Sequence, residues 1–359
     1  MTRIIKLFMA VALCFAVLLT GCSAGSKPPA ERIDDPTTAE NPFAVGEDGT
    51  GITPDASFSY GPLVRSVSFD GSPLNVVYEF DNAGSSFEFG LLAFIDGVLQ
   101  PYSSDSDPGN SYLHAFQLEE GERAEITLTI TPTVGTKGQI QYLRTVVVLH
   151  PFYQPDLTKP VLFGHNLECG ADNYIPVEYL VDAESEGTSI ATDAGSGVVH
   201  VEDISQQTEA YYKENGLSLD EPRLILEDLD TDSQSLAGED SYQFTITGIG
   251  GSSCDYRLYL FCNLEPYVFS SGALLFPRTE RGSTFLSNLE PYLLSSGAHY
   301  VDFPIEKGKQ TSIDIDLDLS ALNAGDTVTV FALAIPVVHE PDNYTIRSLQ
   351  SERYLFVKE

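Results

Sequence analysis

Four acidic residues in the middle of the chain have the spacing of a calcium-binding loop. They occupy positions 1, 3, 5 and 12 of such a loop, and they are Asp228, Asp230, Asp232 and Glu239. Carboxylate oxygens are the ligands that calcium prefers, so this segment could bind a calcium ion. Position 6 is Ser233, where the loop requires glycine for its turn, and the apolar residues 224–226 read as a strand and not as a helix. A solvated acidic loop is the alternative, and calcium is the one cofactor that the sequence suggests.

Cys22 stands at the end of a secretory segment. Arg3 and Lys6 precede an apolar run over residues 7–19, which is too short to remain as a membrane span. The sequence Leu19-Thr20-Gly21-Cys22 resembles the bacterial lipobox. That resemblance implies that Cys22 carries lipid, becomes the first residue of the mature protein, and anchors the chain outside the cytoplasm of a bacterial cell. An ordinary secretion signal with a cysteine at this place by chance is the alternative.

A short motif of glutamine or glutamate, then proline, then tyrosine occurs three times. Its tyrosines are Tyr102, Tyr267 and Tyr292. Exposed tyrosines offer contact area at small entropic cost, so these three are candidate binding residues in loops. In the alternative, the proline ends a strand and the tyrosine packs over the end of the fold. Glycan binding would also depend on tyrosine, because the chain contains no tryptophan.

The remaining polar residues form no familiar catalytic motif. The Gly-x-Ser-x-Gly, His-Glu-x-x-His, Ser-x-x-Lys and P-loop patterns do not occur in the sequence, and its 6 histidines are dispersed. We interpret His150 and His339, at strand ends before proline-rich turns, as packing residues. Acidic residues are so numerous that a pair of carboxylates could still serve an extracytoplasmic hydrolase, which stays an alternative.

The cysteines argue against a disulfide framework. Beyond Cys22, the mature chain contains Cys169, Cys254 and Cys262. If residues 254–262 form a strand, Cys254 and Cys262 are separated by roughly 26 Å, which no disulfide can bridge. A bond between Cys169 and either of them stays open. A zinc site is not expected, because neither Cys-x-x-Cys nor a paired histidine spacing occurs in the sequence.

The segments that would position these residues are almost all short β-strands. They are rich in β-branched and aromatic residues and are bounded by glycine, proline, asparagine and aspartate. We expect strands at residues 74–80, 87–95, 124–131, 143–150, 242–247, 256–262, 312–319, 327–335 and 353–357. The strand at 312–319 alternates between apolar residues and aspartates, which predicts one core face and one solvated face. One short helix is expected at 204–215, with Asp203 as its N-cap and Gly216 as its stop.

Similar segments recur in the same order in both halves of the chain. Phe94 matches Phe261, the motif ending in Tyr102 matches that ending in Tyr267, 126–130 matches 313–317, and 177–181 matches 353–357. We therefore predict an all-β protein with two tandem, related β-sandwich domains that resemble immunoglobulin-like folds. The predicted parts are a lipoprotein signal peptide at 1–21, a lipid-anchored disordered tether at 22–56, a first sandwich at 57–184, a linker with a short helix at 185–215, and a second sandwich at 216–359.

The charge of the chain limits its partners. Its 52 acidic residues outnumber 19 lysines and arginines, and the formal net charge is −33 at pH 7. Such a surface repels nucleic acid, so no nucleic-acid partner is expected. We predict a non-enzymatic binding or scaffolding protein of the bacterial cell surface, bound to the membrane through lipid and to an unknown protein or glycan of the envelope. A transporter-associated solute receptor is a further alternative, which the shortage of alternating β-α units disfavours.

Overall fold

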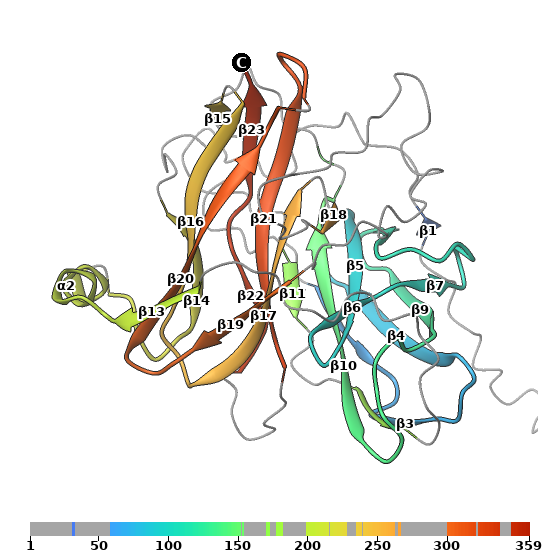
Figure 1. The fold of residues 1–359 in the computed structure, drawn as a ribbon. Coiled ribbons are helices and arrows are strands. Elements are labelled where there is room, and N and C mark those ends of the chain that lie inside the picture. The colour runs from blue at the N-terminus through green and yellow to red at the C-terminus, as the bar shows by residue number, and fades with distance from the viewer. Residues whose placement is uncertain are drawn as a thin grey trace, which may run out of the picture.

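The computed structural model describes residues 31–32, 58–151, 153, 170–172, 177–181, 199–214, 216–227, 235–238, 240–262, 265–266, 300–320, 322–337 and 346–359. These residues form two β-sandwiches that lie side by side, with one short helix between them in sequence (Figure 1). The predicted all-β fold class, with two tandem and related sandwiches, is confirmed. Within the described ranges, no helix is both long enough and apolar enough to cross a membrane.

The first sandwich packs a four-stranded sheet against an eight-stranded sheet. The smaller sheet has the order β2-β4-β9-β7, and the larger has β1-β8-β5-β10-β12-β3, with β11 beside β10 and β6 beside β5. Alternate side chains of β4 and β9 point into the core, as the period of a half-buried strand requires. The bounds are β1 (Glu31–Arg32), β2 (Phe58–Pro62), β3 (Ser66–Phe69), β4 (Leu74–Asn82), β5 (Phe87–Ile95), β6 (Val98–Gln100), β7 (Tyr102–Ser104), β8 (His114–Leu118), β9 (Arg123–Ile130), β10 (Ile140–Leu149), β11 (Gly170–Asp172) and β12 (Val177–Val181).

The second sandwich packs a four-stranded sheet, β13-β20-β16-β14, against a seven-stranded sheet. The larger sheet has the order β15-β23-β21-β17-β18, with β19 beside β17 and β22 beside β21. The expected alternation holds in β20, where Ile313, Ile315 and Leu317 are buried in the core. The bounds are β13 (Val199–Asp203), α2 (Gln206–Glu214), β14 (Arg223–Glu227), β15 (Ser235–Gly238), β16 (Ser241–Ile249), β17 (Cys254–Cys262), β18 (Glu265–Pro266), β19 (Val301–Ile305), β20 (Lys309–Asp318), β21 (Thr327–Pro336), β22 (Leu349–Gln350) and β23 (Tyr354–Lys358).

The two sandwiches share most of their strand order and register, but the edge strand beside β9 is β7 and the one beside β20 is β13, which precedes the other strands of its sandwich. Ile126 lies opposite Tyr78 in the first, and Ile313 lies opposite Ile246 in the second. In both, a short strand runs parallel to the last strand, β3 beside β12 and β15 beside β23. The smaller sheet of the first sandwich follows the A-B-E-D order of an immunoglobulin domain, and each larger sheet contains the neighbours C, F and G.

The hydrogen-bonded register corrects two of the predicted matches. Leu143 pairs with Val177, and the equivalent Val330 pairs with Tyr354, so Val177 corresponds to Tyr354 and not to the preceding arginine. Leu99 lies opposite Phe94 as Pro266 lies opposite Phe261. The motif ending in Tyr267 is therefore displaced by two residues from the motif ending in Tyr102. A register shift of one residue moves every side chain of a strand to the opposite face of the sheet. Short similar sequences do not determine the register to within one or two residues.

The structure also corrects the expected linker. Strand β13 lies within it, yet it pairs with β20 along its full length and so extends the second sandwich. Helix α2 forms as predicted, but its cap is Ser205, whose Oγ accepts from the backbone N–H of Thr208 at 3.0 Å. Gly216 ends the helix with a φ of 67°, a left-handed conformation that glycine adopts at little cost. Within the expected tether, β1 pairs with β8.

An apolar interface joins the two sandwiches. The outer faces of β5 and β10 pack against the outer faces of β17 and β21, and the ring of Phe94 lies 5.4 Å from that of Tyr259. The same positions are used in both copies. Four equivalent pairs take part, and they are Leu92 with Tyr259, Phe94 with Phe261, Val146 with Leu333, and Val148 with Ile335. The contact is therefore close to two-fold symmetric, as in a homodimer.

Hydrogen bonds across this interface fix the two sandwiches relative to each other. The Tyr259 hydroxyl donates to the Gly97 carbonyl at 2.8 Å and accepts from the Leu99 N–H at 3.0 Å. Arg257 donates to the Asp96 carbonyl at 2.6 Å. Arg353, which is 1% exposed, donates to the carbonyls of Leu149 at 2.5 Å and His150 at 3.2 Å. These hydrogen bonds and the apolar contact hold the two sandwiches together.

Candidate functional site

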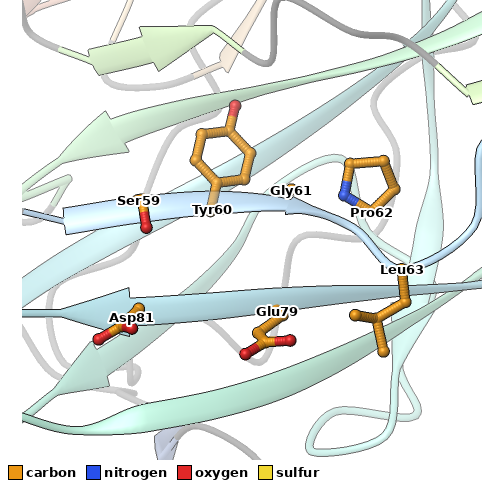
Figure 2. A pocket seen from close by; sticks show the side chains of 7 residues that line it. All are labelled: Ser59, Tyr60, Gly61, Pro62, Leu63, Glu79 and Asp81. Carbon is orange, nitrogen blue, oxygen red and sulfur yellow. The ribbon is translucent and has the colours of Figure 1, made fainter.

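A hollow of about 280 Å³ lies on the outer surface of the first sandwich, over β2 and β4. Its lining residues are Ser59, Tyr60, Gly61, Pro62, Leu63, Glu79 and Asp81 (Figure 2). Gly61 makes room for it, because a Cβ at this position would meet nothing within 4 Å. Figure 2 shows the Tyr60 ring on the side of β2 opposite the Ser59 side chain. The Tyr60 hydroxyl donates to the Thr145 carbonyl at 2.9 Å.

The chemistry of this hollow is that of a solvated, acidic surface. Asp81 Oδ2 lies 2.6 Å from Arg123 Nη2, and these side chains are 34% and 62% exposed. An ion pair this exposed contributes little to stability. Glu79 lies beside Glu125 across the strand pair, which adds negative charge. The hollow can receive a cationic or hydroxyl-bearing group, but it is open to solvent and does not enclose a small molecule.

A histidine–aspartate pair lies in the same sandwich, and its geometry indicates a structural role. His114 Nδ1 lies 2.9 Å from Asp107 Oδ2, and Nε2 lies 2.6 Å from the carbonyl oxygen of Tyr102. Both ring nitrogens therefore lie within hydrogen-bond distance of a protein oxygen. Since both ring nitrogens are held by the fold and the side chain is buried, His114 ties the loop after β7 to β8 and offers no nitrogen to a substrate.

Tyr102 is a core residue, which corrects its prediction as a binding residue. Its side chain is 0% exposed, and its hydroxyl donates to the Leu91 carbonyl at 2.5 Å. Burial raises the pKa of this hydroxyl well above its ordinary value. The aromatic ring contacts the ring of His114 at 4.5 Å between centroids. The packing alternative therefore holds here, while Tyr267 and Tyr292 lie outside the described residues.

The other predicted site residues also fall outside the described ranges. Cys22 and the calcium candidates Asp228, Asp230, Asp232 and Glu239 are among them. Within the described ranges, no three His, Cys, Asp or Glu side chains are grouped so as to hold a metal ion. Cys254 and Cys262 are buried thiols at the two ends of β17, as their separation along a strand predicted, and Cys169 is not described.

The interface between the sandwiches is the feature that our reading of the sequence missed. Its signature is present in the sequence as strands that do not alternate. All nine residues of β5 are buried, and so are the last seven of β21. A strand that is apolar on both faces must be covered on both faces, so these runs are the signal by which the interface can be recognised.

Known proteins give little guidance for this chain. No protein-family model and no curated protein matches its sequence. Among solved structures, the CsuC–CsuE chaperone–tip adhesion subunit complex of Acinetobacter baumannii is 10% identical, with 85% of this chain and 100% of that chain covered and a TM-score of 0.20. The fibronectin(III)-like modules of Clostridium thermocellum CbhA are 10% identical, with 84% and 94% covered and a TM-score of 0.18. The E. coli chaperone DraB is 9% identical, with 84% and 98% covered and a TM-score of 0.22. The fold assignment rests on the strand order and pairing of this chain.

Proposed function

We propose that this chain is a lipid-anchored, non-enzymatic binding or scaffolding protein of the bacterial cell envelope. The observation that carries the proposal is the union of two related sandwiches through a buried apolar face and hydrogen bonds from Tyr259, Arg257 and Arg353. Sheets that are fixed in this way hold their loops and edges at constant separation, which suits recognition by a surface.

The position of β1 supports an anchor close to the folded part. Glu31 and Arg32 pair with Gln117 and Phe116 of β8. Only eight residues lie between Cys22 and Glu31, and the nine steps from one to the other span at most about 30 Å. A lipid on Cys22 would therefore keep the first sandwich near the membrane, with the β8 edge as its nearest fixed point.

The net charge of −33 indicates the kind of partner. The hollow beside Glu79 and Asp81 adds local negative charge to an already acidic surface. A partner that presents lysine, arginine or bound cations is attracted to such a field, and nucleic acid is repelled. We propose a protein or glycan of the cell envelope as the partner.

The test uses the full chain and its Cys22→Ala variant, expressed in a bacterium that is fed labelled palmitate. We expect the label and membrane retention in the full chain and their loss in the variant, since the lipobox resemblance places the lipid on Cys22. Cys14→Ala, within the apolar run, is the matched control and should retain both. Continued labelling of Cys22→Ala would refute the anchor.

The secreted Cys22→Ala protein then serves as bait for envelope proteins and glycans, and it is screened for ester, glycoside and peptide hydrolysis. Capture that weakens in Glu79→Gln and Asp81→Asn would support binding at the hollow. Turnover that one carboxylate substitution abolishes would replace the binding function with that of a hydrolase.

A further inference from the structure

Strand β14 ends the smaller sheet of the second sandwich within the part of the chain that the structure describes. It pairs with β16 over its five residues and has no second partner strand among the described residues. Leu224 and Leu226 point into the core and are about 5% exposed. Arg223, Ile225 and Glu227 alternate with them on the outer face, and Ile225 is 36% exposed. An apolar, regularly paired edge is a template for another strand.

The equivalent edge of the first sandwich is protected. Register places Gly61 of β2 opposite Glu79 of β4, as Ile225 of β14 lies opposite Thr247 of β16. Leu226 of β14 therefore corresponds to Pro62 of β2. Proline has no N–H to donate and is a common means of blocking an edge strand. The protection present in the first copy is missing from β14.

The sequence of β14 is complementary to itself. Its residues are Arg223-Leu224-Ile225-Leu226-Glu227. In an antiparallel pair centred on Ile225, Arg223 of each strand lies opposite Glu227 of the other, and Ile225 lies opposite Ile225. Opposite charges and apolar residues that face each other across strands stabilise a sheet. We propose that β14 binds β14 of a second copy of this chain, so that two four-stranded sheets join into one across a two-fold axis.

Helix α2 lies near this strand, because the charges of Arg223 and Glu227 both act on the hydroxyl of the buried Tyr212. Arg223 Nη2 is 3.8 Å from Glu221 Oε2, and because these side chains are 39% and 61% exposed, the ion pair is weak and exchangeable. The preceding segment with α2 crosses the sheet at one end, since β13 stops opposite Lys309 and β14 starts opposite Ile249.

The opposite edge of the same sheet matches itself poorly. An antiparallel pair of β13 strands centred on Val201 would place Asp203 opposite Val199, where the charge has no partner, and His200 opposite Glu202. The Glu202 carboxylate of β13 already accepts from Gln310 at 2.6 Å. Charge complementarity therefore selects β14 as the self-associating edge.

The test is sedimentation of the Cys22→Ala chain across a concentration series at fixed physiological salt. Salt matters because the net charge of −33 opposes association at low ionic strength. We expect a monomer–dimer equilibrium. Each of the variants Arg223→Glu and Glu227→Arg places two like charges opposite each other at both ends of the strand pair. Each should therefore raise the dissociation constant of the dimer about tenfold or more.

Charge reversal distinguishes pairing from a general loss of structure. An equimolar mixture of Arg223→Glu and Glu227→Arg should form a heterodimer, and the double variant should recover the homodimer, because both restore opposite charges. Arg123→Glu and Glu125→Arg, on the outer face of β9 in the first sandwich, are the matched charge controls and should dimerise as the parent does. A parent chain that stays monomeric, or a dimer that neither single reversal weakens, would overturn the proposal, as would reversals that weaken it without rescue in the mixture.

Discussion

At the scale of single residues, His150 and Arg353 form one of the polar contacts of the domain interface. His150 follows β10 with a φ of 42°, a conformation that non-glycine residues adopt rarely. Its carbonyl accepts from Arg353 of the second sandwich, and its side chain is only 7% exposed. Burial, reinforced by the nearby arginine charge, lowers the pKa of His150 from 6.5 to about 4.

This lowered pKa makes stability depend on pH in a defined range. Below about pH 6.5 the unfolded chain binds a proton at His150 that the folded chain refuses until about pH 4, so the free energy of unfolding falls as pH falls through this range. Roughly 3 kcal/mol is at stake. His150→Asn removes the titration and tolerates the positive φ, so urea unfolding of this variant should lose less stability between pH 7 and pH 4 than the parent does. Parallel losses in the two proteins would contradict the assignment.

At the scale of elements, the hairpin between β5 and β6 connects the sandwiches. Its two turn residues, Asp96 and Gly97, have φ values of 45° and 75°, which are typical of a type I′ turn. A Cβ on Gly97 would lie 3.2 Å from Arg257 Cδ and 3.4 Å from the Ile335 carbonyl oxygen, both in the other sandwich. The turn is therefore fitted to its neighbour as well as to its own strands.

Two alanine substitutions separate these constraints. Gly97→Ala should cost about 1 kcal/mol for its backbone conformation and more for the displaced contact with Arg257. Gly121→Ala is the control, because Gly121 has a similar φ of 73° and open space around its Cβ. Thermal unfolding should show the larger loss for Gly97→Ala, and equal losses would mean that the turn does not bear on the interface.

The elements also show which parts of the fold can be predicted from the sequence alone. Alternation along 312–319 predicted both faces of β20, and turn residues bounded most strands correctly, because these properties are local. The sequence offered both packing and binding for Tyr102, and only the contacts with His114 and the Leu91 carbonyl decide between them. Strand β13 was missed because its residues are mostly exposed, and only its pairing with β20 defines it. Register and interfaces depend on contacts between distant segments, which short motifs do not encode.

At the scale of the whole molecule, the two sandwiches should unfold together. Phe261 is 1% exposed and stacks on Phe331 at 5.1 Å within the interface. A carboxylate placed there would be buried without a partner, which is strongly unfavourable. We expect one calorimetric transition for the parent and two for Phe261→Asp, with Ser59→Asp on the exposed surface as the control. Two transitions in the parent would show that the domains are independent.

The near-symmetric interface has a consequence for how the two copies can differ. Because one chain contains both interface faces, each face is present to the other at an effective concentration on the order of millimolar. Neither face has to bind a copy of itself, as it would in a homodimer. Arg144 of β10 stands at the position of Phe331 of β21. In a true homodimer such a residue would occur twice about the axis, and two buried arginines would oppose each other. Fusion removes that penalty, which leaves the duplicated halves able to diverge in sequence while they stay bound.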